Sequence, residues 1–157
     1  MSAFEAKVLT VSDGVHHGVR EDLSGPALAA ALSSFGVEVV EVRVCPDGAS
    51  VVAAALREMS TGFAGVVVTT GGTGFAPRDE TPEGTRQVID REAPGLAEAM
   101  PAVSPLGRLS RGIAGIVGGC VVINTPGSPK GCVEQLNAVI DVLPHAVALL
   151  NQTPTDH

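Results

Sequence analysis

Three short apolar runs in the first half of the chain have the length and the composition of β-strands. They are rich in β-branched residues, which fit a buried pleated surface, and each is followed by a loop that contains Gly or Asp. The runs span residues 6–12, 37–44 and 65–70. This alternation of apolar runs and polar loops predicts three strands.

Each predicted strand leads into a segment with the start signals of a helix. The signals are a Ser or Thr at the first position and, in two of the three segments, a Pro in the first turn. The segments span residues 24–36, 50–60 and 81–92, with Ser24, Ser50 and Thr81 as the expected N-caps. Because strand and helix alternate three times, we expect parallel strands joined by right-handed crossovers.

The pattern changes in the second half of the chain. Residues 109–125 contain two short apolar runs joined by Gly118-Gly119, which is typical of a hairpin and predicts an antiparallel strand in the sheet. Residues 132–150 have apolar side chains at helical spacing, with a kink or break expected near Pro144. The last seven residues are expected to be frayed.

Composition favours an α/β fold in a single domain that comprises residues 1–157. Of the 157 residues, 45% are hydrophobic and only 3% are aromatic. A core built from Ala, Val, Leu and Ile suits buried parallel strands under helices. A chain of this length buries about 68–70% of its unfolded surface around one core, and no linker or repeat interrupts the sequence.

The charge distribution limits the class of ligand. The net charge of −7 repels polyanions over most of the surface, so we expect no binding to a nucleic-acid backbone. Four of the ten basic residues nevertheless lie in or beside Gly- and Pro-rich stretches: Arg78, Arg108, Arg111 and Lys130. They suggest a local positive pocket for a small phosphorylated ligand.

The cysteines and the N-terminal sequence indicate an intracellular environment. Cys45, Cys120 and Cys132 are an odd number without C-x-x-C spacing, so we expect reduced thiols in the core, with neither a disulfide framework nor a zinc site. The N-terminus lacks a basic leader, and no apolar run reaches the roughly 18 residues of a membrane span. We therefore expect a cytoplasmic protein that binds no membrane.

Four loops are expected at the carboxyl ends of the strands, where open α/β sheets bind their ligands. They are residues 13–23, 45–49, 71–81 and 124–130. In the third loop, Gly71, Gly72 and Gly74 let backbone N–H groups approach an anion closely. The loop matches neither a Walker motif nor a dinucleotide fingerprint, because Phe75 and Pro77 stand where other residues are required.

Two aspartates on these loops are candidates for metal chemistry. Asp47 and Asp79 could hold Mg²⁺ together with a substrate phosphate, a combination that suits phosphoryl or nucleotidyl transfer. Asp followed by Gly is also a favoured turn dipeptide, and Lys130 fits either a phosphate contact or an exposed position in a rigid turn. Adjacent His16 and His17 lack the partners of a metal site, so we expect them to be exposed.

Several motifs follow one another along nearly the whole chain: TVSDG, EDLSGPAL, VCPDG, TTGGTGFAPRDETPE, LSRG and NTPGSPKG. The combination of T-T-G-G-T-G, R-D-x-T-P-E and P-G-S-P-K is far more specific than any one of them. With these motifs the chain resembles the molybdopterin adenylyltransferase family of molybdenum-cofactor biosynthesis, the Mog or MoaB-type proteins.

The resemblance implies a three-layer α/β/α sandwich with a mostly parallel sheet, usually assembled as a homotrimer. It implies an enzyme that uses ATP and Mg²⁺ to attach AMP to the terminal phosphate of molybdopterin and releases pyrophosphate. By position, Asp47 and Asp79 match the family's essential acidic residues, which would also hold the metal. The substrate-binding residues that it implies are Ser12, Asp13, Thr70, Gly71, Gly72, Thr73, Gly74, Ser110, Arg111, Pro126, Gly127, Ser128 and Lys130.

Two alternatives to catalysis stay open at this stage. The family includes members that bind molybdopterin without an established adenylyltransferase activity, so one alternative is a molybdopterin-binding carrier. The other is a trimeric scaffold for further cofactor enzymes. We expect the chain to cover at most the adenylation step, with a molybdenum insertion protein as a partner.

Overall fold

The computed structural model describes residues 4–152, and within them a single six-stranded sheet has the strand order β2-β1-β3-β6-β5-β4. Its strands are β1 (Glu5–Val11), β2 (Glu38–Cys45), β3 (Gly65–Thr70), β4 (Arg91–Glu92), β5 (Ala114–Val117) and β6 (Cys120–Thr125). β1, β2, β3 and β6 are mutually parallel, whereas β5 runs antiparallel to both β6 and β4. The three predicted strands and the hairpin are confirmed.

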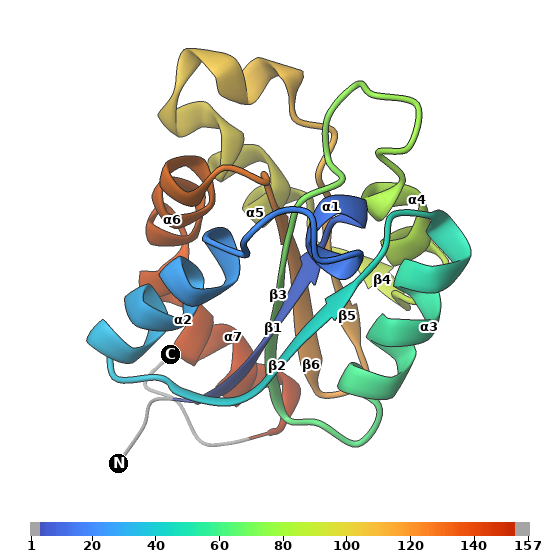
Figure 1. Cartoon of the computed structure of the whole chain (residues 1–157). Coiled ribbons are helices and arrows are strands. Elements are labelled where there is room, and N and C mark those ends of the chain that lie inside the picture. Colours follow the sequence, from blue (N-terminus) through green and yellow to red (C-terminus); the bar gives the residue numbers. More distant parts are fainter. Residues whose placement is uncertain (1–3, 153–157) are drawn as a thin grey trace.

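Helices cover both faces of the sheet, which gives three layers (Figure 1). The α-helices are α1 (Asp13–His16), α2 (Ser24–Ser34), α3 (Ala49–Ser60), α4 (Thr81–Arg86), α5 (Pro94–Ala99), α6 (Pro129–Asn137) and α7 (Leu143–Leu150). Short 3-10 helices are η1 (Pro101–Val103), η2 (Pro105–Leu109) and η3 (Ile140–Val142). The α/β/α sandwich implied by the resemblance is therefore confirmed.

Each face of the sheet has its own apolar core. Helices α2, α6 and α7 bury Leu28, Leu136 and Leu143 on one face, and α3 buries Leu56 on the other. The central strand β3 is buried throughout and supplies side chains to both cores in alternation. This burial on both faces explains why its sequence is a continuous apolar run.

The strand register brings the four candidate loops to one edge of the sheet. Val11 pairs with Cys45, and Thr70 pairs with both Thr10 and Thr125. Since these strands are parallel, each ends at nearly the same height, and the chain leaves all four in the same direction. The loops that begin after Val11, Cys45, Thr70 and Thr125 thus emerge side by side.

All three predicted N-caps are wrong. Helix α2 begins at Ser24, but the N–H of Gly25 donates to Oδ1 of Asp22 at 3.0 Å. Helix α3 has Gly48 at its cap position and no side-chain cap. The hydroxyl of Thr81 donates to the carbonyl of Gly71 at 2.9 Å, so it joins two parts of the loop instead of capping α4.

Two predicted helices differ in extent. The helix expected over 81–92 ends at Arg86, because Arg91 and Glu92 pair with the open edge of β5 as strand β4. The helix expected over 132–150 begins earlier, at Pro129, and is interrupted after Asn137. Helix α7 then has Pro144 in its first turn, which confirms the expected break near this residue.

The last described residues of the chain form a turn after helix α7. Of the seven residues expected to be frayed, 153–157 lie outside the described residues, and Asn151 and Gln152 form this turn.

Within the described chain, no single helix is both long and apolar enough to cross a membrane. The one pair that reaches the length, Pro129–Asn137 with Ile140–Leu150, is bent by 44°.

The loop after β3 depends on two glycines. Gly71 and Gly72 have φ values of +100° and +69°, which residues with a Cβ rarely adopt. A Cβ on Gly71 would lie 2.2 Å from the carbonyl oxygen of Val11, and one on Gly72 would lie 2.2 Å from Oγ1 of Thr81. The path of this loop therefore requires glycine at both positions, because a side chain at either would collide with Val11 or Thr81.

Replacing Gly72 with Ala tests this close approach against backbone strain alone. Gly62 has nearly the same φ, +67°, but a Cβ there would have no atom within 4 Å. Both Ala variants incur the left-handed penalty of about 1–2 kcal/mol. We expect Gly72→Ala to lose about 1–3 kcal/mol more than Gly62→Ala in urea unfolding, because the loop must also move away from Thr81. Equal losses in the two variants would contradict the packing argument.

Candidate functional site

Two adjoining hollows lie at the carboxyl ends of the parallel strands. The large hollow has a volume of about 900 Å³, and the small hollow has a volume of about 490 Å³. Gly72, Asp79, Gly127 and Ser128 line both. The two hollows therefore share one wall, which is built from the loop after β3 and the loop after β6.

The small hollow contains both candidate acidic residues. Asp47 comes from the loop after β2 and Asp79 from the loop after β3. Ser12, Thr70 and Gly71 also line this hollow. The expectation that Asp47 and Asp79 lie in one groove is thus met within a single chain.

Asp47 is held against the first loop by a reciprocal pair of hydrogen bonds. The N–H of Asp13 donates to Oδ2 of Asp47 at 2.9 Å, and the N–H of Asp47 donates to Oδ1 of Asp13 at 3.1 Å. Arg78 adds bonds from Nε and Nη2 to the Asp13 carboxylate, at 2.6 and 3.1 Å, and from Nη2 to the Asp47 carbonyl at 2.9 Å. Three loops are thereby joined around the Asp47 backbone.

The two aspartates of this pair have opposite electrostatic surroundings. The hydrogen bond from Arg78 lowers the pKa of Asp13, and the N–H of Asp47 and the charge of Arg78 add to this shift. Burial raises the pKa of Asp47, and the negative charges of Asp13 and Asp79 raise it further. The carboxylate of Asp47, which lines the small hollow, is therefore the one whose charged form its surroundings disfavour.

Asp79 lies near the end of the glycine loop, residues 71–80, which joins β3 to α4. Its Oδ2 accepts the N–H of Ala76 at 3.0 Å, and the same oxygen would lie 3.0 Å from a Cβ on Gly74. The carboxylate is half-buried and reaches both hollows. A side chain at position 74 would press against this carboxylate, so the glycine leaves room for it.

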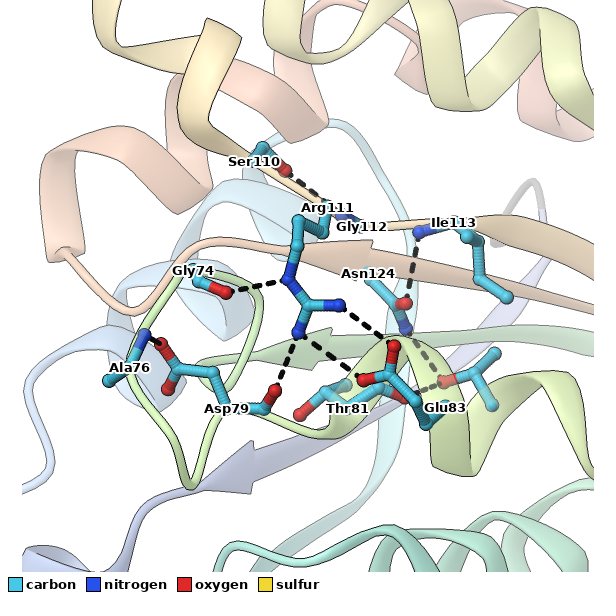
Figure 2. A network of polar contacts seen from close by, with 11 residues as sticks. Gly74, Ala76, Asp79, Thr81, Glu83, Ser110, Arg111, Gly112, Ile113 and Asn124 are labelled. Carbon is cyan, nitrogen blue, oxygen red and sulfur yellow. Dashed lines mark hydrogen bonds and ion pairs between the residues drawn. The ribbon is translucent and has the colours of Figure 1, made fainter.

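Arg111 fixes the loop that carries Asp79. Figure 2 shows its guanidinium directed into this loop, where Nε donates to Gly74 O at 2.8 Å and Nη2 donates to Asp79 O at 2.6 Å. Nη1 donates to Oε2 of Glu83 at 2.8 Å, and the backbone N–H of Arg111 donates to Thr73 O at 2.8 Å. The donors of Arg111 are thus used within the protein, and its side chain lines neither hollow.

A buried polar network supports the base of the same loop. The side chain of Asn124 accepts the N–H of Ile113 at 3.1 Å (Figure 2). It also donates to the hydroxyls of Thr69 and Thr85, each at 3.0 Å. The residues Asn124, Thr69 and Thr85 are at most 1% exposed. The network joins β3, β6 and α4, so the start of the hairpin and the glycine loop are held together from below.

The loop after β6 is attached to the glycine loop. The hydroxyl of Thr70 donates to Pro126 O at 2.7 Å, and a Cβ on Gly127 would lie 3.4 Å from the Cα of Gly71. Ser128 caps helix α6 by accepting the N–H of Gly131 at 3.0 Å. Lys130 is 89% exposed in its side chain and lies 3.8 Å from Glu134, so this cation remains accessible from the large hollow.

The residues implied by the resemblance divide into two groups. Those that line a hollow are Ser12, Asp47, Thr70, Gly71, Gly72, Thr73, Gly74, Asp79, Ser110, Pro126, Gly127, Ser128 and Lys130. Asp13 and Arg111 line neither, and instead bind other loop residues. Of the four cations expected to form a positive pocket, only Lys130 lines a hollow, because Arg78 and Arg111 pair with carboxylates and Arg108 donates to a carbonyl.

The expected exposure of the histidines and the expected burial of the cysteine thiols are confirmed. His16 and His17 are exposed, with ring centroids 5.1 Å apart. Cys45, Cys120 and Cys132 are buried free thiols, and burial raises the pKa of Cys45 to about 11. Thiols with pKa values this high stay protonated at neutral pH and act as packing residues.

The structure adds lining residues that sequence reasoning missed. In the large hollow they include the apolar residues Val103, Leu106 and Leu109, from the segment of η1 and η2. Leu106 is 77% exposed, and no periodic pattern in the sequence marked this segment. In the small hollow the missed cation is Arg20, whose position within a candidate loop was its only signal.

The chain is similar to known proteins over nearly its whole length. A family model described as a probable molybdopterin binding domain matches residues 7–145. The molybdopterin adenylyltransferase of Helicobacter pylori strain J99 is 38% identical, over 96% of this chain and 89% of its own length. The molybdenum cofactor synthesis protein cinnamon of Drosophila melanogaster is 37% identical over 96% of this chain, and the chain spans 26% of that protein.

A solved structure agrees with these sequence matches. The molybdopterin biosynthesis enzyme MoaB of Thermus thermophilus has a TM-score of 0.90 and 43% identity, and the match covers 96% of this chain and 98% of that one. The resemblance inferred from the motifs is thus confirmed over nearly the whole length. The chain belongs to the molybdopterin-binding domain family of cofactor biosynthesis proteins.

Proposed function

We propose that this protein is an enzyme of molybdenum cofactor biosynthesis that transfers AMP from ATP to the terminal phosphate of molybdopterin. The observation that carries the proposal is that Asp47 and Asp79, from two separate loops, line one hollow beside the glycine loop. Relatives named molybdopterin adenylyltransferase match the chain over most of its length, which supports a nucleotidyltransferase.

The reaction requires no nucleophile from the protein. An oxygen of the molybdopterin phosphate attacks the α-phosphorus of ATP, the bond from this phosphorus to the α,β-bridging oxygen breaks, and pyrophosphate leaves. The main obstacle is that two polyanions must approach each other, so positioning and charge stabilisation carry the catalysis. Two hollows that share a wall suit this task, since each substrate can lie in one with its phosphates at the shared residues.

The acidic pair fits a bound Mg²⁺. Within residues 4–152, no three His, Cys, Asp or Glu side chains gather closely enough to hold a metal ion by themselves. Mg²⁺ is commonly held by only one or two carboxylates together with substrate phosphates and water, and Asp47 and Asp79 offer this set. When bound, Mg²⁺ would neutralise phosphate charge and stabilise the leaving pyrophosphate.

The family resemblance also supports a cytoplasmic homotrimer that passes its product to a molybdenum insertion protein. Light scattering of the purified protein tests the assembly. A mass of three chains is expected, and a monomer that retains full activity would refute this part of the proposal.

The activity is tested directly by mixing the protein with molybdopterin, ATP and Mg²⁺. Adenylated molybdopterin and pyrophosphate are expected in equal amounts, and neither is expected when EDTA removes the metal. A carrier would instead bind molybdopterin tightly, bind ATP weakly regardless of Mg²⁺, and form no product. That result would overturn the catalytic proposal.

Replacing either candidate acidic residue with its amide should abolish most turnover. Asp47→Asn and Asp79→Asn are each expected to lower the rate about 100-fold or more, because the amide cannot supply the negative charge that a metal requires. Asp141→Asn is the matched control, since Asp141 is exposed and lies far along the chain in η3. Rates of pyrophosphate release measure the effect, and parent-like rates for both site variants would exclude these roles.

Arg111 should act as a positioning residue for Asp79. In Arg111→Lys the positive charge remains, but a single nitrogen cannot bind Gly74 O, Asp79 O and Glu83 together. We expect turnover to fall about 10-fold and the Mg²⁺ concentration for half-maximal activity to rise, because Asp79 loses its fixed place. Calorimetry should show little change in molybdopterin affinity.

Arg108→Lys provides the control for this variant, because Arg108 donates only to Pro105 O in its own 3-10 helix. If Arg111→Lys weakened molybdopterin binding and left the Mg²⁺ dependence unchanged, Arg111 would be a direct substrate ligand after all.

A further inference from the structure

The small hollow contains one cation that the loops do not use. Its lining includes four acidic residues, Glu21, Asp22, Asp47 and Asp79, and a single basic residue, Arg20. A phosphorylated molecule that enters this hollow meets negative charge on several sides, and the repulsion grows where water is partly excluded. The position of Arg20 therefore bears directly on whether a phosphate can bind there.

Arg20 is held in place through its backbone and its side-chain stem. Its N–H donates to Gly14 O at 3.2 Å, just beyond helix α1. A Cβ on Gly14 would lie 3.3 Å from the Cβ of Arg20 and 3.7 Å from its Nε. The stem thus occupies the space into which a side chain at position 14 would extend, and the glycine leaves room for it.

The guanidinium itself has no partner, although acidic residues follow it directly. Among the arginines and lysines that the structure describes, two have charged groups that make no hydrogen bond or ion pair, namely Arg20 and Arg91. The neighbouring Asp22 is already engaged, since its Oδ1 accepts the N–H of Gly25 and its Oδ2 accepts the hydroxyl of Thr10 at 2.9 Å. The donors of Arg20 are therefore free for a ligand.

Arg20 and Arg91 differ in where they lie. Arg20 lines the hollow that contains Asp47 and Asp79, whereas Arg91 lies on the edge strand β4 and lines neither hollow. A free guanidinium with several N–H donors matches phosphate oxygens, often with two bonds at once. No other arginine or lysine in the described part of the chain lines the small hollow.

We propose that Arg20 binds phosphate oxygens of a substrate in the small hollow and offsets the repulsion from its carboxylates. The inference rests on the proposed function for the identity of the substrates. The phosphate belongs either to the triphosphate of ATP or to the monoester of molybdopterin. Arg20 is then a substrate-binding residue on the first loop, in addition to the glycine loop and the loop after β6.

The test compares Arg20→Gln with Arg20→Lys and with Arg91→Gln. Calorimetry measures the affinity of each variant for ATP, for inorganic pyrophosphate and for molybdopterin, and steady-state rates give KM for the two substrates. Arg20→Gln should weaken one phosphorylated ligand about 10- to 100-fold, as expected when a charge-assisted hydrogen bond is lost. Arg20→Lys should recover part of the loss, and the deficit should shrink at about 0.5 M salt.

The affected ligand identifies the source of the phosphate. A loss for ATP and pyrophosphate alone places the triphosphate at Arg20, and a loss for molybdopterin alone places its monoester there. Arg91→Gln should remain within about twofold of the parent, because it removes the same charge from outside the hollows. Because Arg20 is exposed, unchanged urea unfolding is expected for all three variants.

Two results would overturn the inference. One is parent-like affinity of Arg20→Gln for all three ligands, and the other is an equal loss in Arg91→Gln, which would show a general effect of net charge. The calorimetric measurements need no turnover. A parent protein that binds ATP but forms no product would therefore refute the proposed catalysis and leave the role of Arg20 decided by the binding data.

Discussion

The close approach of backbones at Gly71 and Gly72 determines where the site can be built. The chain leaves the central strand β3 in a conformation that places Gly71 against the carbonyl of Val11 and Gly72 against the hydroxyl of Thr81. Thr81 closes the loop by donating its N–H to Gly72 O at 3.0 Å and its hydroxyl to Gly71 O. Asp79 lies within the loop so closed. The wall shared by the two hollows follows from this path of the chain.

An acidic protein with few basic residues has to divide them between its own loops and its substrates. Arg78 and Arg111 bind carboxylates and carbonyls of the loops, which fixes the positions of Asp47 and Asp79 without adding free positive charge to the hollows. Arg20 in the small hollow and Lys130 in the large one remain accessible. Under the proposed function, different cations would supply rigidity and substrate attraction, and loss of one kind should not mimic loss of the other.

The sequence was sufficient to predict the strands, the hairpin and the edge of the sheet that carries the site, because buried strands and turn glycines have strong local signatures. It was not sufficient for contacts between distant loops. Thr81 has the local features of a helix cap, but its hydroxyl binds Gly71, and Arg91 and Glu92 continue a helical pattern yet pair with β5. The motifs likewise include Arg111, but they do not reveal that its side chain points into the loop that carries Asp79.

The pair Asp13 and Asp47 shows why geometry decides between equal local signals. Both are followed by Gly, both come shortly after neighbouring parallel strands, and each accepts the N–H of the other. Arg78, from a third loop, binds the carboxylate of Asp13 and only the carbonyl of Asp47. One carboxylate is thereby neutralised within the protein, while the other faces the small hollow with a raised pKa. The difference between the two carboxylates thus depends on Arg78, a residue that neither Asp-Gly pair can reveal.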